Sequence, residues 1–292
     1  TQAYNTFVIM NVIDEPMISP LTSLQFCEGD SVVLVGNALY GNQWYLDGSP
    51  ISNATDTSYT AFVSGAYSLG TTSGGLGDLW SFGLNANGTF GNGENFNSGE
   101  PTASTTTQSF DEISTGDNFV VAVNAAGDVY SWGENTAGQL GDGTYTSTNE
   151  PAQVPTLTNI KTIATAAQSS MAVSNTGEVY VWGINSNGQL GTGNTSVINF
   201  PFLNSGLTNV DSIAGGKQHF VMLKNDGTVW TVGNNDQGQL GHGNLSTLYT
   251  AVQVPGLTNV VSVGASEYSS YAILSTGELM VWGNNGSGQL GL

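Results

Sequence analysis

The sequence predicts an all-β protein: an incomplete β-propeller of 50-residue, four-stranded blades, with about four to five blades present, preceded by an immunoglobulin-like β-sandwich. Three observations predict this fold. A glycine-rich segment starting at Gly127 recurs from Gly177, Gly227 and Gly277, and more weakly from Gly77, always 50 residues apart. Each period contains short apolar segments separated by tight turns. No segment shows the helical period of 3.6 residues, and periods of this size are typical of propellers and other repeat architectures.

Residues 1–15 precede the first recognisable domain. Their strand-like segment, 6–13, is expected to be the end of a preceding module or a linker. The chain begins at Thr1 and shows no leader peptide, so we expect it to be a piece of a longer precursor.

Residues 16–75 do not follow the repeat and predict a separate small domain. An apolar strand after Cys27, a central Trp44 and a late Gly65-Ala66-Tyr67 occur in the order of an immunoglobulin-like sandwich. Cys27 is the only cysteine, so an intrachain disulfide is excluded. The segment resembles the small immunoglobulin-like modules of large secreted bacterial surface proteins.

Residues 76–292 carry the repeat and predict the blades. In one period the strands are expected near 210–214, 220–223, 229–232 and 252–254. These segments are short, rich in β-branched and aromatic residues, and bounded by Gly, Asn or Asp, which is typical of strands. The turn Lys224–Gly227 carries a glycine where a tight hairpin requires a positive φ.

Tryptophans recur at the end of the third predicted strand. Trp132, Trp182 and Trp282 are expected to fill equivalent buried sites, with Val232 in the same site of its own blade. The chain stops directly after the Gly-Gln-Leu-Gly of the fifth repeat. We therefore expect an open arc of blades, and a parent protein that continues for two or three more.

The repeated string resembles a known family. Trp182-Gly-x-Asn-x-x-Gly-Gln-Leu-Gly191 and the segment Ile213–His219 are similar to the regulator of chromosome condensation family. The resemblance covers residues 77–292 and implies a β-propeller, usually of seven blades. Eukaryotic members act on a small GTPase and on chromatin. The residues matched here are scaffold residues, so the resemblance does not carry that activity over.

Composition excludes several classes of partner. The formal net charge is −19, from 22 acidic residues and three lysines, without any arginine. Nucleic-acid binding depends on Lys and Arg that neutralise phosphates, so no nucleic-acid partner is expected. The apolar runs are far too short for a membrane-spanning helix, so membrane insertion is not expected. Only 9% of residues are charged. Asn, Ser, Thr and Gly dominate instead, which favours an extracellular or cell-surface location.

The sequence shows no motif of catalytic or metal chemistry. His219 and His242 stand alone, without a further ligand at metal-binding spacing. Nucleophile elbows, phosphate loops and calcium loops are missing. We therefore expect no catalytic residue, no metal ligand and no cofactor. The alternative is a propeller hydrolase or lyase with a site at the central channel, which would require titratable groups to converge in one pocket.

The stretch after each Gly-Gln-Leu-Gly differs most between repeats. In repeat folds such variation maps to loops on one face, often the binding face. Aromatic and aliphatic residues among Ser, Thr and Asn suit contacts with a partner. Some of these side chains could instead tuck under the blade rim. The candidate binding residues are Phe96, Tyr145, Ile198, Phe200, Leu248 and Tyr249. The predicted function is a non-enzymatic binding module of a secreted or surface-displayed bacterial protein, whose propeller loop face engages a protein or a glycan.

Overall fold

The computed structural model describes residues 79–291 except 105 and 107, and, in the segment before them, the backbone of seven short strands together with Ile51. The chain divides into two compact units, one of Thr1–Val8 with Leu79–Leu292 and one of Ile9–Asp78. All regular elements of the described residues are strands, which confirms the all-β class.

The unit Ile9–Asp78 contains two three-stranded antiparallel sheets. Their strand orders are β2 (Ile18–Pro20), β3 (Val32–Gly36), β6 (Ser58–Ala61) and β5 (Ser49–Pro50), β4 (Asn42–Leu46), β7 (Tyr67–Thr71). Trp44 of β4 lies opposite Leu69 of β7. Cys27 lies outside the described residues, and the immunoglobulin-like interpretation of 16–75 stays a prediction.

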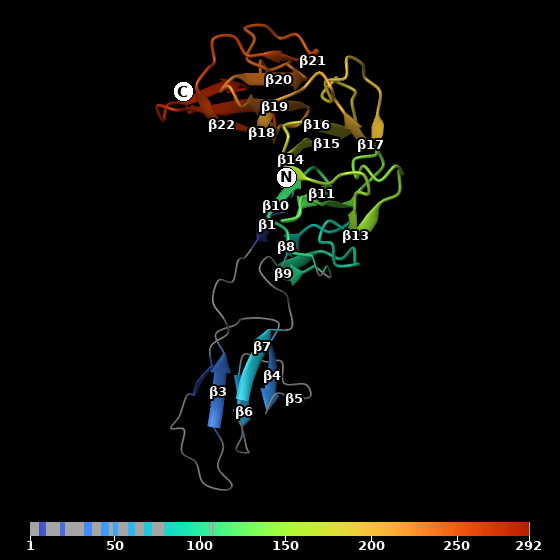
Figure 1. Ribbon diagram of the computed structural model, residues 1–292, viewed down its shortest axis with the longest axis vertical. Coiled ribbons are helices and arrows are strands. Elements are labelled where there is room, and N and C mark those ends of the chain that lie inside the picture. The colour runs from blue at the N-terminus through green and yellow to red at the C-terminus, as the bar shows by residue number, and fades with distance from the viewer. Residues whose placement is uncertain are drawn as a thin grey trace. The chain divides into compact units, whose positions relative to one another are not determined.

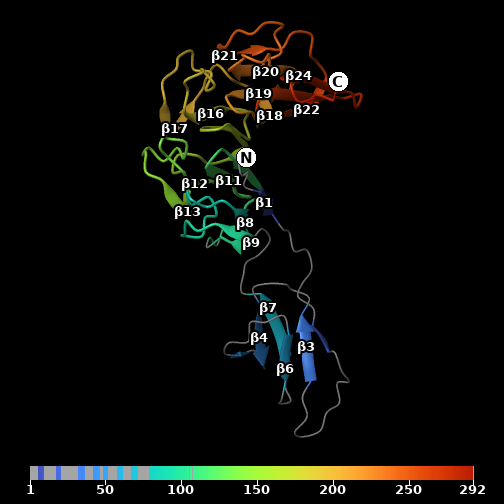
Figure 2. The ribbon, with the colours of Figure 1, turned by 180° about the vertical axis from the view of Figure 1, so that it is seen from behind.

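The repeat unit consists of five sheets, which lie one after another in chain order (Figures 1 and 2). The first contains β1 (Thr6–Ile9), β8 (Leu79–Gly83) and β9 (Ser98–Ala103). The second contains β10 (Glu112–Thr115), β11 (Phe119–Val123), β12 (Val129–Gly133) and β13 (Thr148–Gln153). The domain limits 1–15, 16–75 and 76–292 stay predictions.

The later sheets repeat this order. The third contains β14 (Ile160–Thr165), β15 (Ser169–Ser174), β16 (Val179–Gly183) and β17 (Ile198–Leu203). The fourth contains β18 (Val210–Gly215), β19 (His219–Lys224), β20 (Val229–Gly233) and β21 (Leu248–Gln253). The fifth contains β22 (Val260–Ala265), β23 (Ser269–Leu274) and β24 (Leu279–Gly283). The predicted four-stranded blade is therefore confirmed.

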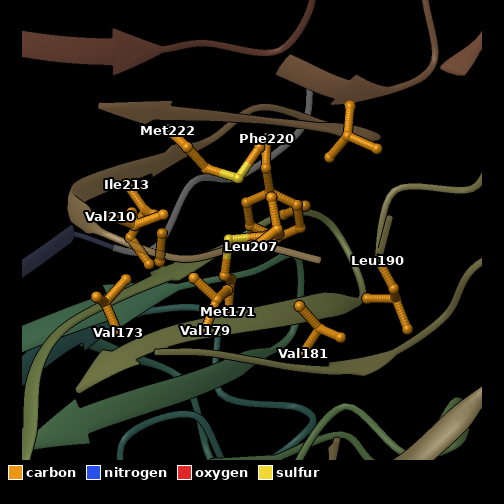
Figure 3. Packing of buried hydrophobic residues seen from close by; sticks show 13 residues of the cluster. Met171, Val173, Val179, Val181, Leu190, Leu207, Val210, Ile213, Phe220 and Met222 are labelled. Atoms are coloured by element: carbon orange, nitrogen blue, oxygen red, sulfur yellow. The ribbon is translucent and has the colours of Figure 1, made fainter. Parts of the chain in front are cut away.

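Successive blades stack face to face because their middle strands are apolar on both sides. Met171, Val173 and Val179 on one face of the third blade form a single cluster with Phe220 and Met222 of the fourth (Figure 3). Alternate residues of a strand point to opposite faces, so a strand buried on both sides carries apolar residues on both faces. This explains the continuous apolar segments of the repeat.

The fifth blade has one uncovered face. Leu279 is 60% exposed and Ile273 is 42% exposed, whereas their equivalents in the fourth blade, Val229 and Leu223, are buried against the fifth. The strands β8 and β24 belong to different sheets, so they do not pair to close a ring. The expected open arrangement of the described blades is confirmed.

Each blade has two distinct ends. The turn between the first and second strands, such as 116–118, lies at the same end as the long loop after the third strand, such as 134–147. The backbone N–H of Glu134 donates to the carbonyl of Asn118 at 2.8 Å and joins them. We call this the loop end. The hairpins between second and third strands, such as 124–128, lie at the opposite end, the hairpin end.

Candidate binding site

A buried asparagine fixes the shape of each long loop. The Oδ1 of Asn135 accepts a hydrogen bond from the backbone of Leu140 at 3.0 Å. Its Nδ2 donates to the carbonyls of Thr144 and Thr146 at 3.3 and 3.1 Å. Asn185 and Asn235 repeat this bonding in the next two blades. These hydrogen bonds therefore order the loops before any partner binds. Binding to them does not carry the entropy cost of ordering a loop.

A second set of bonds ties each loop to the outer strand of the next blade. The Nδ2 of Asn149 donates to the carbonyl of Gly93 at 2.7 Å, and Asn199 makes the same bond to Gly143 at 2.8 Å. The backbone of Gly93 in turn donates to the carbonyl of Asn149 at 3.0 Å. Neighbouring loops thus form one continuous surface along the rim of the blades.

Four of the six candidate residues are exposed on this surface. Their exposed fractions are 78% for Phe96, 56% for Tyr145, 51% for Phe200 and 45% for Tyr249. Ile198 and Leu248 are half-buried at the starts of β17 and β21, and Ile198 packs against the core cluster below it. Those two residues therefore sit partly under the rim. The role of all six in binding stays a prediction.

The structure adds apolar residues that sequence reasoning missed. Val197 and Leu245 are exposed in the same loops, and Phe202 and Leu203 are exposed on β17, the outermost strand of its blade. Leu245 occupies the position of Tyr145 two repeats earlier, so the 100-residue offset was the signal that could have identified it. The third and fourth blades therefore present more apolar surface than the candidate list predicts.

A hollow of about 440 Å³ lies at the loop end, where the first strands meet their turns. Asp117, Lys217 and Glu267 are the titratable residues in its lining. Lys217 Nζ contacts Glu267 Oε1, and this bond raises the pKa of Lys217 to about 12. Burial raises the pKa of Asp117, and Lys217 partly offsets that effect. The lysine is thus protonated and engaged near neutral pH.

The blades also bring together a serine and a histidine that the sequence did not pair. His219 Nε2 lies 3.0 Å from Ser270 Oγ, and both side chains are fully buried. Ser270 Oγ donates to the carbonyl of Gln239 at 2.7 Å, so the histidine is the donor to Ser270. Nδ1 of His219 has no hydrogen-bond partner, and burial lowers the pKa of the ring to about 4. A solvent-borne substrate cannot reach this pair.

His242, the second lone histidine, is half-buried in the loop after β20. Its Nε2 lies 3.0 Å from Thr231 Oγ1, and burial lowers its pKa. Within the part of the chain that the structure describes, no three His, Cys, Asp or Glu side chains gather where they could hold a metal ion.

Among the described residues there is also no helix of the length and apolar character that a membrane crossing requires.

Comparison with protein families identifies the repeat. The Regulator of chromosome condensation (RCC1) repeat matches residues 126–173, 176–223 and 226–273. A second description of the same repeat matches 110–139, 160–189, 210–239 and 260–289. The chain belongs to the RCC1 repeat family. The two descriptions cut the repeat at different points, and both follow the 50-residue period of the blades.

Solved structures of RCC1-type propellers share the fold. Human WBSCR16 aligns with a TM-score of 0.65 at 23% identity, covering 89% of this chain and 76% of that chain. Prp20p from Saccharomyces cerevisiae aligns with a TM-score of 0.65 at 20% identity, covering 74% and 56%. Yeast RCC1 (Prp20) bound to Kap60 gives 0.63 at 20% identity, covering 72% and 52%. These identities establish the fold alone.

The chain spans about half the length of the two yeast chains. One of these was solved in complex with Kap60, and the other was studied for its binding to Gsp1p and histones. A comparison with curated proteins gave no match.

Proposed function

We propose that this RCC1-repeat chain is a non-enzymatic interaction module of a secreted or surface-displayed bacterial protein, and that its loop end engages a protein or a glycan. The observation that carries the proposal is the set of exposed aromatic and aliphatic side chains on the rim loops. Phe96, Tyr145 and Leu245 project from loops fixed by buried asparagines. Phe200 and Tyr249 are exposed near the starts of the strands that follow such loops, β17 and β21. Rigid loops that display aromatic anchors are typical of binding surfaces.

The hollow supports an interaction module better than an enzyme. A general base or nucleophile must be available near neutral pH. Lys217 is held in its charged form by Glu267. The His219–Ser270 pair is buried, and the serine proton is directed to Gln239 rather than to the ring. A hydrolase or lyase at the central channel is the alternative, and it would have to rely on Asp117.

Two further facts support the proposed class and location. The yeast relatives of the same fold were studied in complex with, or for binding to, other proteins, which favours protein binding by this fold. The scarcity of charged residues and the abundance of Asn, Ser, Thr and Gly favour the extracellular or cell-surface setting.

The test uses substitutions that the chain itself supplies. Phe96→Ser, Tyr145→Thr, Phe200→Thr and Leu245→Thr each introduce the residue found at the same position of a sister repeat, so the fold should be preserved. Wild type and this fourfold variant are screened against a glycan array and a phage-displayed library of random 12-residue peptides. We expect wild type to select ligands and the variant to lose them by at least about tenfold, as anchor residues do.

Asp117→Ala is the matched control, since Ala167 holds that position in the next blade. It should leave binding unchanged. If Asp117→Ala loses binding while the fourfold variant keeps it, the binding site lies in the hollow, and the enzyme alternative is favoured.

A further inference from the structure

The rim of the first two blades combines exposed rings with carboxylates. Phe96 and Tyr145 are the two most exposed aromatic side chains of the described residues. Glu94, Glu100 and Glu150 are exposed in the same loops and outer strands. We call these five residues the Phe96–Tyr145 patch.

The patch is continuous across the two blades. Asn149 Nδ2, next to Glu150 in the chain, donates to the carbonyl of Gly93 at 2.7 Å and lies 3.3 Å from Asn95 Oδ1, next to Phe96. A Cβ added to Gly93 would lie only 3.1 Å from Glu150 Oε1. The carboxylate of Glu150 in the second blade therefore rests over the loop of the first blade, which carries Glu94 and Phe96.

The carboxylates of this patch are not neutralised within the described chain. Its two ion pairs are Lys161–Asp211 and Lys217–Glu267, and the third lysine, Lys224, lies over the ring of Trp230 with Nζ 4.1 Å from its centroid. The chain has three lysines and no arginine. A cation that meets the Phe96–Tyr145 patch must come from a partner.

The chain's own lysines show how such a cation would be held. Lys217 contacts the Glu267 carboxylate and lies 5.3 Å from the centre of the Tyr268 ring. An ammonium or guanidinium group is attracted both to a carboxylate and to the face of an aromatic ring, and its alkyl stem covers apolar surface. The Phe96–Tyr145 patch offers both kinds of group to a partner's side chains.

We propose that the Phe96–Tyr145 patch binds a basic protein segment, whose Lys or Arg side chains meet the carboxylates and rings. This inference rests on the proposed function and names the class of its partner. Charge complementarity carries it, because a neutral or acidic partner would cover three carboxylates without compensating their lost hydration. The net charge of −19 strengthens the same preference at long range.

The test begins with peptides that wild-type protein selects from the random 12-residue library. These peptides are synthesised and labelled, and their affinity for the protein is measured by fluorescence anisotropy. We expect them to be rich in Lys and Arg, and replacing those residues by Gln should weaken binding at least about tenfold. Glu94→Asn with Glu150→Thr, residues taken from Asn194 and Thr250, should weaken binding and flatten its dependence on salt.

A charge-matched control removes two carboxylates from the hairpin end. Asp128→Thr with Glu278→Thr copies Thr228 and should leave peptide affinity unchanged. An equal loss in this control would overturn the patch in favour of diffuse attraction. If the selected peptides are neutral but still bind more weakly to Phe96→Ser and Tyr145→Thr, the proposal of a basic partner is wrong, while the proposed function stands. Peptide and glycan binding that ignores every rim substitution would overturn the proposed function itself.

Discussion

At the scale of single residues, one tryptophan site explains the regularity of the blades. Trp132 and Trp182 are fully buried, and their indole N–H groups donate at 2.8 Å to the carbonyls of Thr89 and Gln139 in the preceding blade. Trp282 makes the same bond to Gln239 at 2.9 Å but is only half-buried. The expected equivalence is thus confirmed, with less burial in the last blade.

The fourth blade shows how the site accepts a smaller residue. Val232 is fully buried there, as expected. Asn204 fills the remaining space and donates to the carbonyls of Leu190 and Gly191, both at 3.1 Å. Two smaller side chains, Val232 and Asn204, therefore stand in place of the indole, and the donor now bonds the two carbonyls that follow Gln189, the counterpart of Gln139. A tryptophan removed alone would lack this compensation.

Trp182→Ala should lower the free energy of unfolding by about 3–5 kcal/mol, because it opens a cavity between two blades and leaves the Gln139 carbonyl without its indole donor. Trp282→Ala is the matched control and should cost less, since its site is partly open to solvent. Urea denaturation measures both. A Trp182→Ala curve that overlays the wild-type curve would contradict the assigned packing.

His219 predicts a pH dependence of stability. Its pKa is about 4 in the folded chain and about 6.5 when unfolded, because burial opposes the charged ring. Above pH 6.5 the ring is neutral in both states and costs nothing. As the pH falls from 6.5 to about 4, the unfolded chain gains a proton that the folded chain does not. Stability therefore drops in this window, by an amount on the order of 3 kcal/mol.

His219→Phe isolates this effect from the titration of carboxylates. Phe119 occupies the same site in the second blade, packed beneath Gly116 as His219 is beneath Gly216. Urea denaturation at pH 7 and pH 4.5 should show a smaller loss of stability for His219→Phe than for wild type. Equal losses in the two proteins would show that His219 does not carry the penalty.

At the scale of elements, a glycine ends each third strand beneath the preceding turn. Gly183 has a φ of 98°, and a Cβ there would lie 2.4 Å from the carbonyl oxygen of Gln168. Gly143 in the rim loop has a φ of 83°, but a Cβ there would meet nothing within 4 Å. The two positions share a positive φ and differ in available space.

This difference gives a matched pair of substitutions. Gly143→Ala should cost roughly 1–2 kcal/mol, the strain of a left-handed residue alone. Gly183→Ala should cost clearly more, because β16 must also move away from the turn that contains Gln168. Thermal unfolding of both variants measures the difference. Equal shifts in melting temperature would contradict the close approach at Gly183.

The strands could be predicted from the sequence, whereas the exposure of the candidate binding residues could be predicted only in part. The apolar segments and the turn glycines are local signals, and the register recurs from Phe119 opposite Gly133 to Ser269 opposite Gly283. Exposure in the loops depends on contacts between blades. Ile198 packs downward because a core cluster lies beneath it, and no periodicity indicates that. The His219–Ser270 contact likewise joins residues 51 positions apart across a blade interface.

At the scale of the whole molecule, buried apolar clusters between stacked blades hold the described blades together. Four clusters of buried residues join each described blade to the next. We expect a chelator to leave the melting temperature unchanged, because a metal ion stabilises a protein only where the native state binds it. Differential scanning calorimetry with and without EDTA tests this. A fall of several degrees would reveal a metal site.

Binding of a partner through the rim loops at the loop end can be located by hydrogen–deuterium exchange of the wild-type chain, with and without a peptide selected from the random library. We predict slower exchange at 92–97 and 144–150 and unchanged exchange at the inner turns 116–118, 166–168 and 216–218. Protection confined to the inner turns would contradict binding through the rim loops and place the site in the hollow.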